Sequence, residues 1–303
     1  MQYKLHHFGI LSQDMNQSLN TYRNHFCQDF TSRWFNKDHL DIAFLGKGSQ
    51  ATMEIVAPPH LDYETAHIDK HGYCLNHLAF LVEDAEEAHE ELAAKGVRVA
   101  WEPFLMDDVL GLCQCAFYDE DDVLFEVFSY PKGKPMALPK KTTPKPKDLR
   151  LHHVNILTPD LRRSQRFYEQ KLGMKTVVEA LEDEGGAVFL VDPSYDYKEN
   201  DFMLEIVGPP YLEPREVTLL EQRGACLDHL CFIADDLSGA WEDAVVRGAK
   251  QVTEPILYHG GYLAWFVDPD GVDVEIMTPF PEDMIENALL TGKPPNLAQP
   301  DDG

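Results

Sequence analysis

Two sets of histidine and glutamate residues occur in the same order along the chain, and each set has the chemistry of a metal site. The first set is His7, Glu54, His77 and Glu126, and the second is His153, Glu205, His229 and Glu275. Imidazole nitrogens and carboxylate oxygens are common ligands of divalent cations. The sets are offset by about 150 residues, which is typical of an internal duplication. The pattern predicts two related halves, each with a metal site built from two histidines and two glutamates.

The residues around these candidates repeat as well. The matching stretches are residues 5–7 with 151–153 (Leu-His-His), 54–56 with 205–207 (Glu-Ile-Val), and 77–78 with 229–230 (His-Leu). A Pro-Pro pair follows both Glu-Ile-Val stretches. The duplication therefore covers the surroundings of the candidate ligands and not the ligands alone.

Each half divides again into two modules of about 70 residues with the same order of elements. Helices are expected near 15–27, 84–95, 160–171 and 236–247, each preceded by one strand and followed by three. The histidines fall on first strands and the glutamates on last strands of these βαβββ modules. We therefore expect an α+β fold in which four modules pair into two open barrel-like domains.

The pairing of the modules stays open at this point. Modules 1 with 2 and 3 with 4 would give the two ligand sets above, whereas modules 1 with 4 would group His7 and Glu54 with His229 and Glu275. Strand alternation sends His6 and His152 to the face opposite His7 and His153, which predicts a structural role for them or, at most, a place behind the metal ligands. The expected domain boundaries are 1–130 for the first domain, 131–149 for a linker, 150–280 for the second domain and 281–303 for a tail. The linker is expected from its proline and lysine content.

The composition and charge of the chain argue against nucleic-acid and membrane partners. The chain has 52 acidic and 26 basic residues and a formal charge of −26, which argues against a nucleic-acid surface. No apolar run is long enough to cross a membrane, and the first residues lack a signal peptide's apolar core. The six cysteines form no Cys-x-x-Cys pair, so we expect reduced thiols and a cytoplasmic protein. The expected partner is a small molecule with adjacent oxygens; a homodimer stays open.

The motifs resemble the vicinal oxygen chelate superfamily, which includes glyoxalase I, methylmalonyl-CoA epimerase and extradiol dioxygenases. Residues 7–10 and 153–156 resemble its opening strand, and Asp268-Pro269-Asp270-Gly271 before Glu275 resembles its closing turn and strand. The first half departs from that turn with Asp119-Glu120-Asp121-Asp122. Aspartates also form turns, so we expect the same turn there.

This resemblance implies a divalent metal cofactor (Zn, Ni, Co, Mn or Fe) and a chemistry that depends on the number of ligands. In this superfamily, extradiol dioxygenases hold the metal with two histidines and one carboxylate. Glyoxalase I and the epimerase hold it with four protein ligands. Glu54 and Glu205 fill the fourth position here. The resemblance therefore implies an isomerase, epimerase or lyase that stabilises an enediolate on the metal, with Glu126 or Glu275 moving the proton.

Two alternatives remain at this point. One is an Fe(II) extradiol-type dioxygenase, and the other is a non-catalytic metal-binding or small-molecule-binding protein. We expect the second half to be the more active one, because it has the complete Asp-Pro-Asp-Gly turn and an extra histidine, His259, as a further catalytic candidate.

Overall fold

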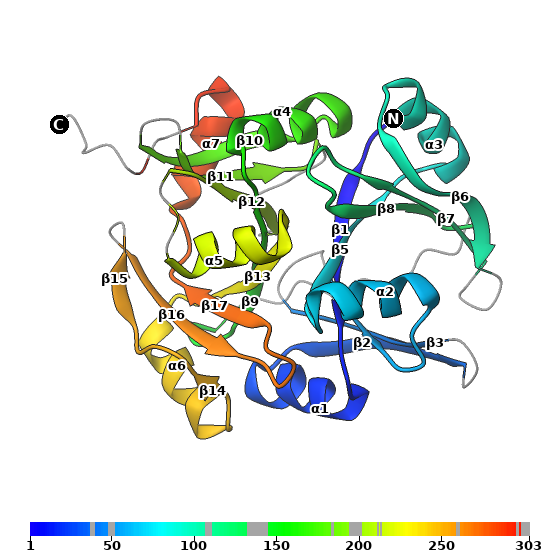
Figure 1. The fold of residues 1–303 in the computed structure, drawn as a ribbon. Coiled ribbons are helices and arrows are strands. Elements are labelled where there is room, and N and C mark those ends of the chain that lie inside the picture. Colours follow the sequence, from blue (N-terminus) through cyan, green and yellow to red (C-terminus); the bar gives the residue numbers. More distant parts are fainter. Residues whose placement is uncertain are drawn as a thin grey trace.

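Two curved sheets lie side by side in the computed structural model, one from each half of the chain (Figure 1). The structure describes residues 1–36, 40–47, 52–106, 111–131, 145–182, 185–193, 202–210, 212, 214–258, 261–294 and 297. Neither sheet closes on itself, so each is an open, barrel-like wall, as the repeated modules predict. Within these residues, no helix has the length and apolar character needed to span a membrane.

The first sheet contains eight strands in the order β2-β3-β4-β1-β5-β8-β7-β6. Their bounds are β1 Lys4–Leu11, β2 Asp29–Asn36, β3 Leu40–Gly46, β4 Thr52–Ala57, β5 Leu75–Leu81, β6 Arg98–Met106, β7 Leu112–Tyr118 and β8 Leu124–Ser129. The second sheet contains nine strands and follows the same plan, β10-β11-β12-β9-β13-β17-β16-β14, with β15 beside β16. Their bounds are β9 Arg150–Leu157, β10 Lys175–Glu182, β11 Gly185–Val191, β12 Met203–Gly208, β13 Cys226–Ile233, β14 Lys250–Gln251, β15 Ile256–Tyr258, β16 Gly261–Val267 and β17 Asp273–Met277.

The four central strands of each sheet carry one candidate ligand each. In the first sheet, the order β4-β1-β5-β8 places Glu54, His7, His77 and Glu126 side by side. In the second sheet, β12-β9-β13-β17 does the same for Glu205, His153, His229 and Glu275. The sheets therefore pair modules 1 with 2 and 3 with 4, which settles the alternative that the sequence left open.

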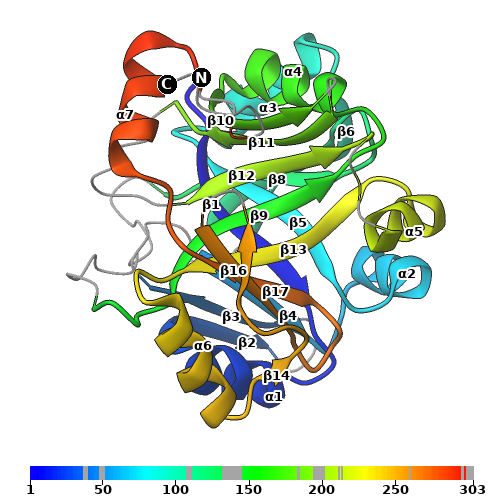
Figure 2. The same ribbon diagram turned by 90° about the vertical axis from the view of Figure 1, so that its left-hand side faces the viewer.

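Four helices were expected from the sequence, and the structure contains all of them. They are α1 Met15–Asn20, which continues as the π-helical turn η1 Thr21–His25, α3 Ala85–Ala94, α4 Leu161–Leu172 and α6 Leu237–Val246. Aspartates begin them: the side chain of Asp14 accepts hydrogen bonds from two backbone N–H groups of α1, and Asp84 does so for α3. Three further helices were not expected, α2 Asp62–His71, α5 Pro214–Arg223 and α7 Glu282–Thr291. In Figure 2, α7 lies along β10 of the second sheet.

The two halves share one hydrophobic core. Phe8 of β1 stacks with Phe202 at a centroid distance of 5.9 Å, and Phe26 stacks with Phe232 of β13 at 5.6 Å. Two buried hydrogen bonds cross between the halves in a symmetric way. The Tyr22 hydroxyl donates to Asp268 over 2.9 Å, and the Tyr168 hydroxyl donates to Asp119 over 3.0 Å. The helix of module 1 thus binds the closing turn of module 4, and the helix of module 3 binds that of module 2.

The described strands of the first sheet end at Ser129, and those of the second begin at Arg150. Most of the expected linker, residues 132–144, lies outside the described residues. The proposed domain boundaries are compatible with these strand ends and stay predictions.

Candidate metal centres and their cavities

In the second half, two imidazoles and two carboxylates converge on one point. Nε2 of His153 lies 3.3 Å from Oε2 of both Glu205 and Glu275. Nε2 of His229 lies 3.3 Å from Glu205 and 3.6 Å from Glu275. The two Nε2 atoms are 3.4 Å apart. All four residues are buried.

The equivalent residues of the first half also converge, with wider spacing. Nε2 of His77 lies 3.0 Å from Oε2 of Glu54 and 3.8 Å from Oε2 of Glu126. Nε2 of His7 lies 3.6 Å from Glu54. His7, His77 and Glu126 form one buried group of donor atoms, and His153, Glu205 and His229 form another. The structure therefore brings together the candidate ligands of each predicted set.

These donor sets fit a divalent cation. Donor atoms that share one cation at about 2.1 Å lie roughly 3 to 3.5 Å from one another. In the second half the two imidazole nitrogens lie 3.4 Å apart and 3.3 to 3.6 Å from the glutamate oxygens, close to this spacing. In the first half, Nε2 of His7 and of His77 is buried and makes no hydrogen bond to a described residue. Buried polar atoms without partners are costly. A cation with nitrogen and oxygen ligands would satisfy both nitrogens.

Positive charge is already drawn to both sites by the carboxylates. In the second half burial lowers the pKa of both histidines, but Glu205 and Glu275 outweigh this effect and raise the pKa of His153. Asp228, followed by the same two glutamates, raises the pKa of His229. Burial in turn raises the pKa of Glu275, yet the two imidazoles hold it at about 2. In the first half burial also lowers the pKa of His77, but Glu126 and Glu54 raise it to about 9.

The cavity at the first site is lined by one carboxylate more than the cavity at the second site. Glu64 of α2 is buried and lines the same cavity as Glu54 and Glu126. Burial raises the pKa of Glu126 to about 7; His77 opposes the shift, whereas Glu54 and Glu64 add to it. A cation at the first site would therefore displace a proton from Glu126 at neutral pH. At the position of Glu64 the second half has Arg215, which binds Asp228 and Asp273.

The two sites open into cavities of very different size. The cavity at the first site measures about 60 Å³, which is room for a few water molecules. The cavity at the second site measures about 430 Å³, within the usual range for small-molecule sites. Its walls are mostly apolar, with Phe189, Phe280, Met277 and Met284 among them. Met284 belongs to α7, so the C-terminal helix completes the second cavity.

Three pairs of equivalent positions explain the difference in volume. The register of the outer strands matches Trp34 and Ile42 of the first half with Ala180 and Ala187 of the second. On the other side of the site, Leu112 matches Gly261. All six residues line their respective cavities. In addition, α2 places Tyr63 and Glu64 over the first site, whereas no described residue of α5 lines the second cavity.

The neighbours of the ligands also differ between the halves. Asn155 donates a hydrogen bond from Nδ2 to Oε2 of Glu205 over 3.0 Å. The equivalent position in the first half is Gly9, where a Cβ atom would lie 2.2 Å from the imidazole of His77. Glycine is required there because the His77 ring packs against the backbone of β1. Position 9 thus offers no side chain that could hold Glu54 as Asn155 holds Glu205.

The closing turn of the first half forms as the sequence predicts. The Asp119 carboxylate accepts hydrogen bonds from the backbone N–H groups of Asp121 and Val123, at 2.8 and 2.9 Å. Asp268 makes the matching bonds to Asp270 and Val272, at 2.9 and 2.8 Å. Asp122 has a φ of 71°, at the place where Gly271 has 93°. An aspartate therefore adopts the left-handed conformation without a glycine.

One sequence expectation is wrong. His6 and His152 do not point away from the ligands: Nδ1 of His6 lies 2.8 Å from Nδ1 of His7, and His152 has the same contact with His153. The alternation rule fails because each strand has a β-bulge at this residue. The catalytic candidate His259 lies outside the described residues. Sequence reasoning also missed Asn155 and Arg215, whose equivalent positions in the first half hold Gly9 and Glu64, so that the repeat gives no signal for them.

The comparisons with known proteins agree with this geometry. Models of the Glyoxalase/Bleomycin resistance protein/Dioxygenase superfamily match residues 6–108 and residues 150–276. The chain belongs to this superfamily and contains two of its units in tandem.

The sequence identity to individual relatives is low. The chain is 25% identical to a lactoylglutathione lyase of Schizosaccharomyces pombe, over 91% of this chain and 96% of that protein. Among solved structures it is similar to a Mn(II)-bound glyoxalase from Novosphingobium aromaticivorans, with a TM-score of 0.62, 16% identity and coverage of 91% and 82%. A 2,3-dioxygenase, LapB, from Pseudomonas sp. KL28 has the same TM-score and identity, with coverage of 92% and 94%. These two likenesses concern the fold.

Proposed function

We propose that the protein is a divalent-metal-dependent enzyme that moves a proton beside a carbonyl group, as an isomerase, epimerase or lyase, and that the second half is the reacting one. The observation that carries this proposal is the convergence of His153, Glu205, His229 and Glu275, because all of them except His229 line a large apolar cavity. The similarity to a lactoylglutathione lyase supports the lyase branch.

The four residues are the proposed ligands of the second site, and their first-half equivalents are the proposed ligands of the first. Bound there, a divalent cation supplies Lewis-acid stabilisation of the negative charge that develops on the substrate oxygens after proton loss. Four protein donors leave space for two neighbouring oxygens of one substrate. This donor number favours proton transfer over a dioxygenase reaction, which needs a further open position for oxygen.

Glu275 is the proposed base. Its partner carboxylate Glu205 is held by Asn155, whereas Glu275 is bonded by no side-chain amide among the described residues. A carboxylate that no amide anchors can take a proton from a carbon atom beside the carbonyl and return it. Positioned proton transfer of this kind contributes on the order of 100- to 10,000-fold to a rate.

The cavity restricts the substrate to molecules with an apolar body. Phe189, Leu263, Met277 and Phe280 surround the space above the donor set. An aliphatic or aromatic group fits this wall, while two adjacent oxygens face the histidines and glutamates. The proposed substrates are therefore 2-oxo or 2-hydroxy compounds, or thioesters, with an apolar substituent.

Solvent exchange tests this proposal. Purified protein is loaded with manganese, zinc, nickel or cobalt and incubated in deuterated water with phenyl- and alkyl-substituted candidates. Mass spectrometry should show deuterium at the carbon beside the carbonyl. Exchange should stop with a chelator and return when the metal is added back.

The same assay separates the alternatives. Stoichiometric oxygen uptake with a catechol on the Fe(II)-loaded protein, and no exchange with any carbonyl compound, would identify a dioxygenase instead. Tight metal binding without proton exchange or oxygen uptake would instead indicate a non-catalytic binding protein. Glu126→Gln serves as the matched control, because it alters the equivalent carboxylate of the other site.

A further inference from the structure

Each proposed histidine ligand is in contact, through its second ring nitrogen, with the residue that precedes it in the sequence. In the first half, Nδ1 of His7 lies 2.8 Å from Nδ1 of His6. Nδ1 of His77 lies 3.0 Å from Oδ1 of Asn76. The same atom of each imidazole is engaged, and its Nε2 atom faces the glutamates.

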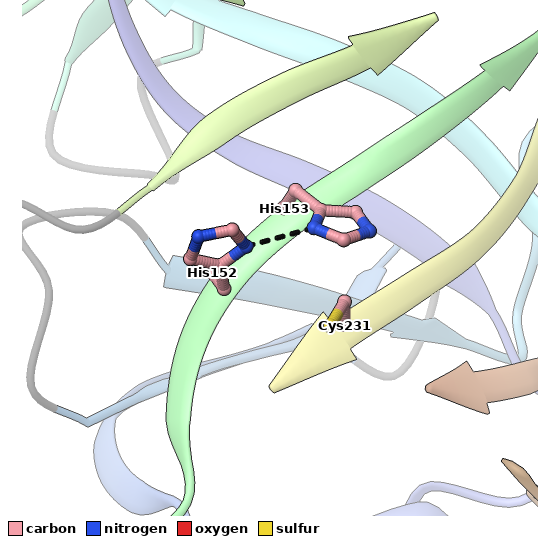
Figure 3. A group of neighbouring side chains, drawn as sticks. All are labelled: His152, His153 and Cys231. Carbon is pink, nitrogen blue, oxygen red and sulfur yellow. Dashed lines mark hydrogen bonds between the residues drawn. The ribbon is translucent and has the colours of Figure 1, made fainter. Parts of the chain in front are cut away.

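The second half repeats the arrangement. Nδ1 of His153 lies 2.8 Å from Nδ1 of His152, and Nδ1 of His229 lies 3.2 Å from Oδ2 of Asp228. Figure 3 shows the imidazoles of His152 and His153 on β9, turned toward one another, with Cys231 on the neighbouring strand β13. Each of the four neighbours is almost fully enclosed or, for Asp228, has a side chain only 2% exposed.

Regular strands do not allow such contacts, because consecutive side chains point to opposite faces. Each of the four places has a register shift instead. Between β1 and β5 the register shifts across His6 and again across Asn76; between β9 and β13 it shifts across His152 and across the Asp228–His229 step. A bulge inserts one extra residue and re-aims its side chain. Four bulges at the same place relative to four candidate ligands form one structural device.

We propose that His6, Asn76, His152 and Asp228 are positioning residues that accept a hydrogen bond from Nδ1–H of the following histidine. The accepted bond fixes the tautomer in which Nε2 carries a lone pair, and it fixes the angle of the ring. This inference rests on the metal-binding part of the proposed function and concerns how the protein holds the cation. Outer-shell acceptors of this kind raise the basicity of a histidine ligand.

The acceptors of the two halves differ in strength. Asp228 is a carboxylate held by Arg215, with N–O distances of 2.9 and 3.1 Å. Its counterpart Asn76 is a neutral amide. A charged acceptor makes a stronger hydrogen bond than a neutral one. The second site should therefore bind a given cation more tightly than the first.

The contact between His152 and His153 can be tested with two matched variants of His152. His152→Leu removes the acceptor, whereas His152→Asn keeps one, because Asn76 has an acceptor oxygen beside the Nδ1 atom of the following histidine at another of the four bulges. Zinc is titrated into the full-length protein in competition with a chromophoric chelator, which reports both sites. His152→Leu should weaken the second site about 10- to 100-fold, and His152→Asn should keep most of the wild-type affinity. If His152 donated its proton instead, His152→Leu would tighten zinc binding, which would overturn the proposal.

The second test exchanges the two acceptors and changes almost no volume. Asp228→Asn should weaken the second site, and Asn76→Asp should strengthen the first, each by roughly tenfold or more. Asp69→Asn, exposed on α2 and outside both cavities, is the control for the change in charge. The absorption spectrum of the cobalt-loaded protein should change at the altered site only, a readout that a purely structural residue would not move.

The outcomes separate this inference from the proposed function. Failure of the wild-type protein to take up zinc or cobalt would contradict the proposed metal sites themselves. Uptake at both sites, with affinities unchanged by Asp228→Asn and Asn76→Asp, would overturn only the role of the bulged neighbours. These two near-isosteric variants keep the test valid if His152→Leu fails to fold.

Discussion

The two halves share a donor set but not a cavity. Each sheet brings two histidines and two glutamates together from its four central strands. Above the first set, Trp34, Ile42 and Leu112 leave about 60 Å³; above the second, Ala180, Ala187 and Gly261 leave about 430 Å³. The two copies of the site thus share their candidate metal ligands and differ in the residues that line the cavity above them. The comparison suggests one site for a cation alone and one for a cation with a substrate.

The largest expected difference concerns turnover. Glu275→Gln should lower turnover about 100- to 10,000-fold, because it removes the proposed base. Glu126→Gln should lower turnover less than about tenfold, since the first cavity has no room for a substrate. The measurement is the rate of solvent deuterium exchange with the metal-loaded variants. Equal losses, or a greater loss from Glu126→Gln, would end the asymmetry.

Removal of the cation should affect stability in both halves. A ligand present at about 100 times its dissociation constant stabilises the folded state by about 2.7 kcal/mol per site. A chelator should therefore lower the free energy of unfolding by about 3 kcal/mol for each occupied site. His7→Ala and His153→Ala should each abolish one half of this effect in urea titrations. A chelator effect that persists in full in either variant would place the cation elsewhere.

The contact between the halves should behave symmetrically, in contrast to the sites. Burial raises the pKa of Asp119 and of Asp268 to about 6, although both accept hydrogen bonds. Since the folded-state pKa lies above the unfolded value, their stabilising contribution is complete below about pH 4 and is lost as the pH rises through 6.

Asn at either position removes this titration. Between pH 4 and 7, the free energy of unfolding of Asp119→Asn and of Asp268→Asn should rise relative to the wild type by about 2 to 3 kcal/mol. Denaturant titrations at several pH values measure this change. A change in only one of the two variants would show that the interface is as asymmetric as the sites.

The smallest effect is expected from exchanging the cavity walls. Ala180→Trp should raise the substrate KM roughly 10- to 100-fold, about 1.4 to 2.7 kcal/mol, because it fills the second cavity. The reverse change, Trp34→Ala, should open the first cavity without adding turnover, since α2 still covers that site with Tyr63 and Glu64. Steady-state kinetics on both variants checks the pair. An unchanged KM in Ala180→Trp would move substrate binding away from this cavity.

Much of the fold could be predicted from the sequence because the four modules have the same order of strands and helix. The four helices begun by aspartates and the strands that carry the ligands were all expected. Helix α2 was missed because its apolar residues follow helical spacing only weakly. Pro214 at the start of α5 fits a first helical position only once the helix is known.

The candidate ligands were also readable, since histidines on first strands and glutamates on last strands meet at the centre of such a sheet. The contacts of His6 with His7 and of His152 with His153 were not, because a bulge depends on the register with the neighbouring strand. Nor was the difference between the cavities. Trp34 and Ala180 have the same sequence offset as His7 and His153, but only the folded structure shows that both side chains line the cavities.

The most direct test of the central claim is a crystal structure of the manganese-loaded protein soaked with a phenyl-substituted hydroxamate, which offers two adjacent oxygens and an apolar body. Anomalous scattering locates the manganese, and the electron density locates the hydroxamate. Manganese should bind at both donor sets, and the hydroxamate should bind only at the second, with its ring beside Phe189 and Phe280. A hydroxamate at the first site, or manganese at neither donor set, would contradict the account.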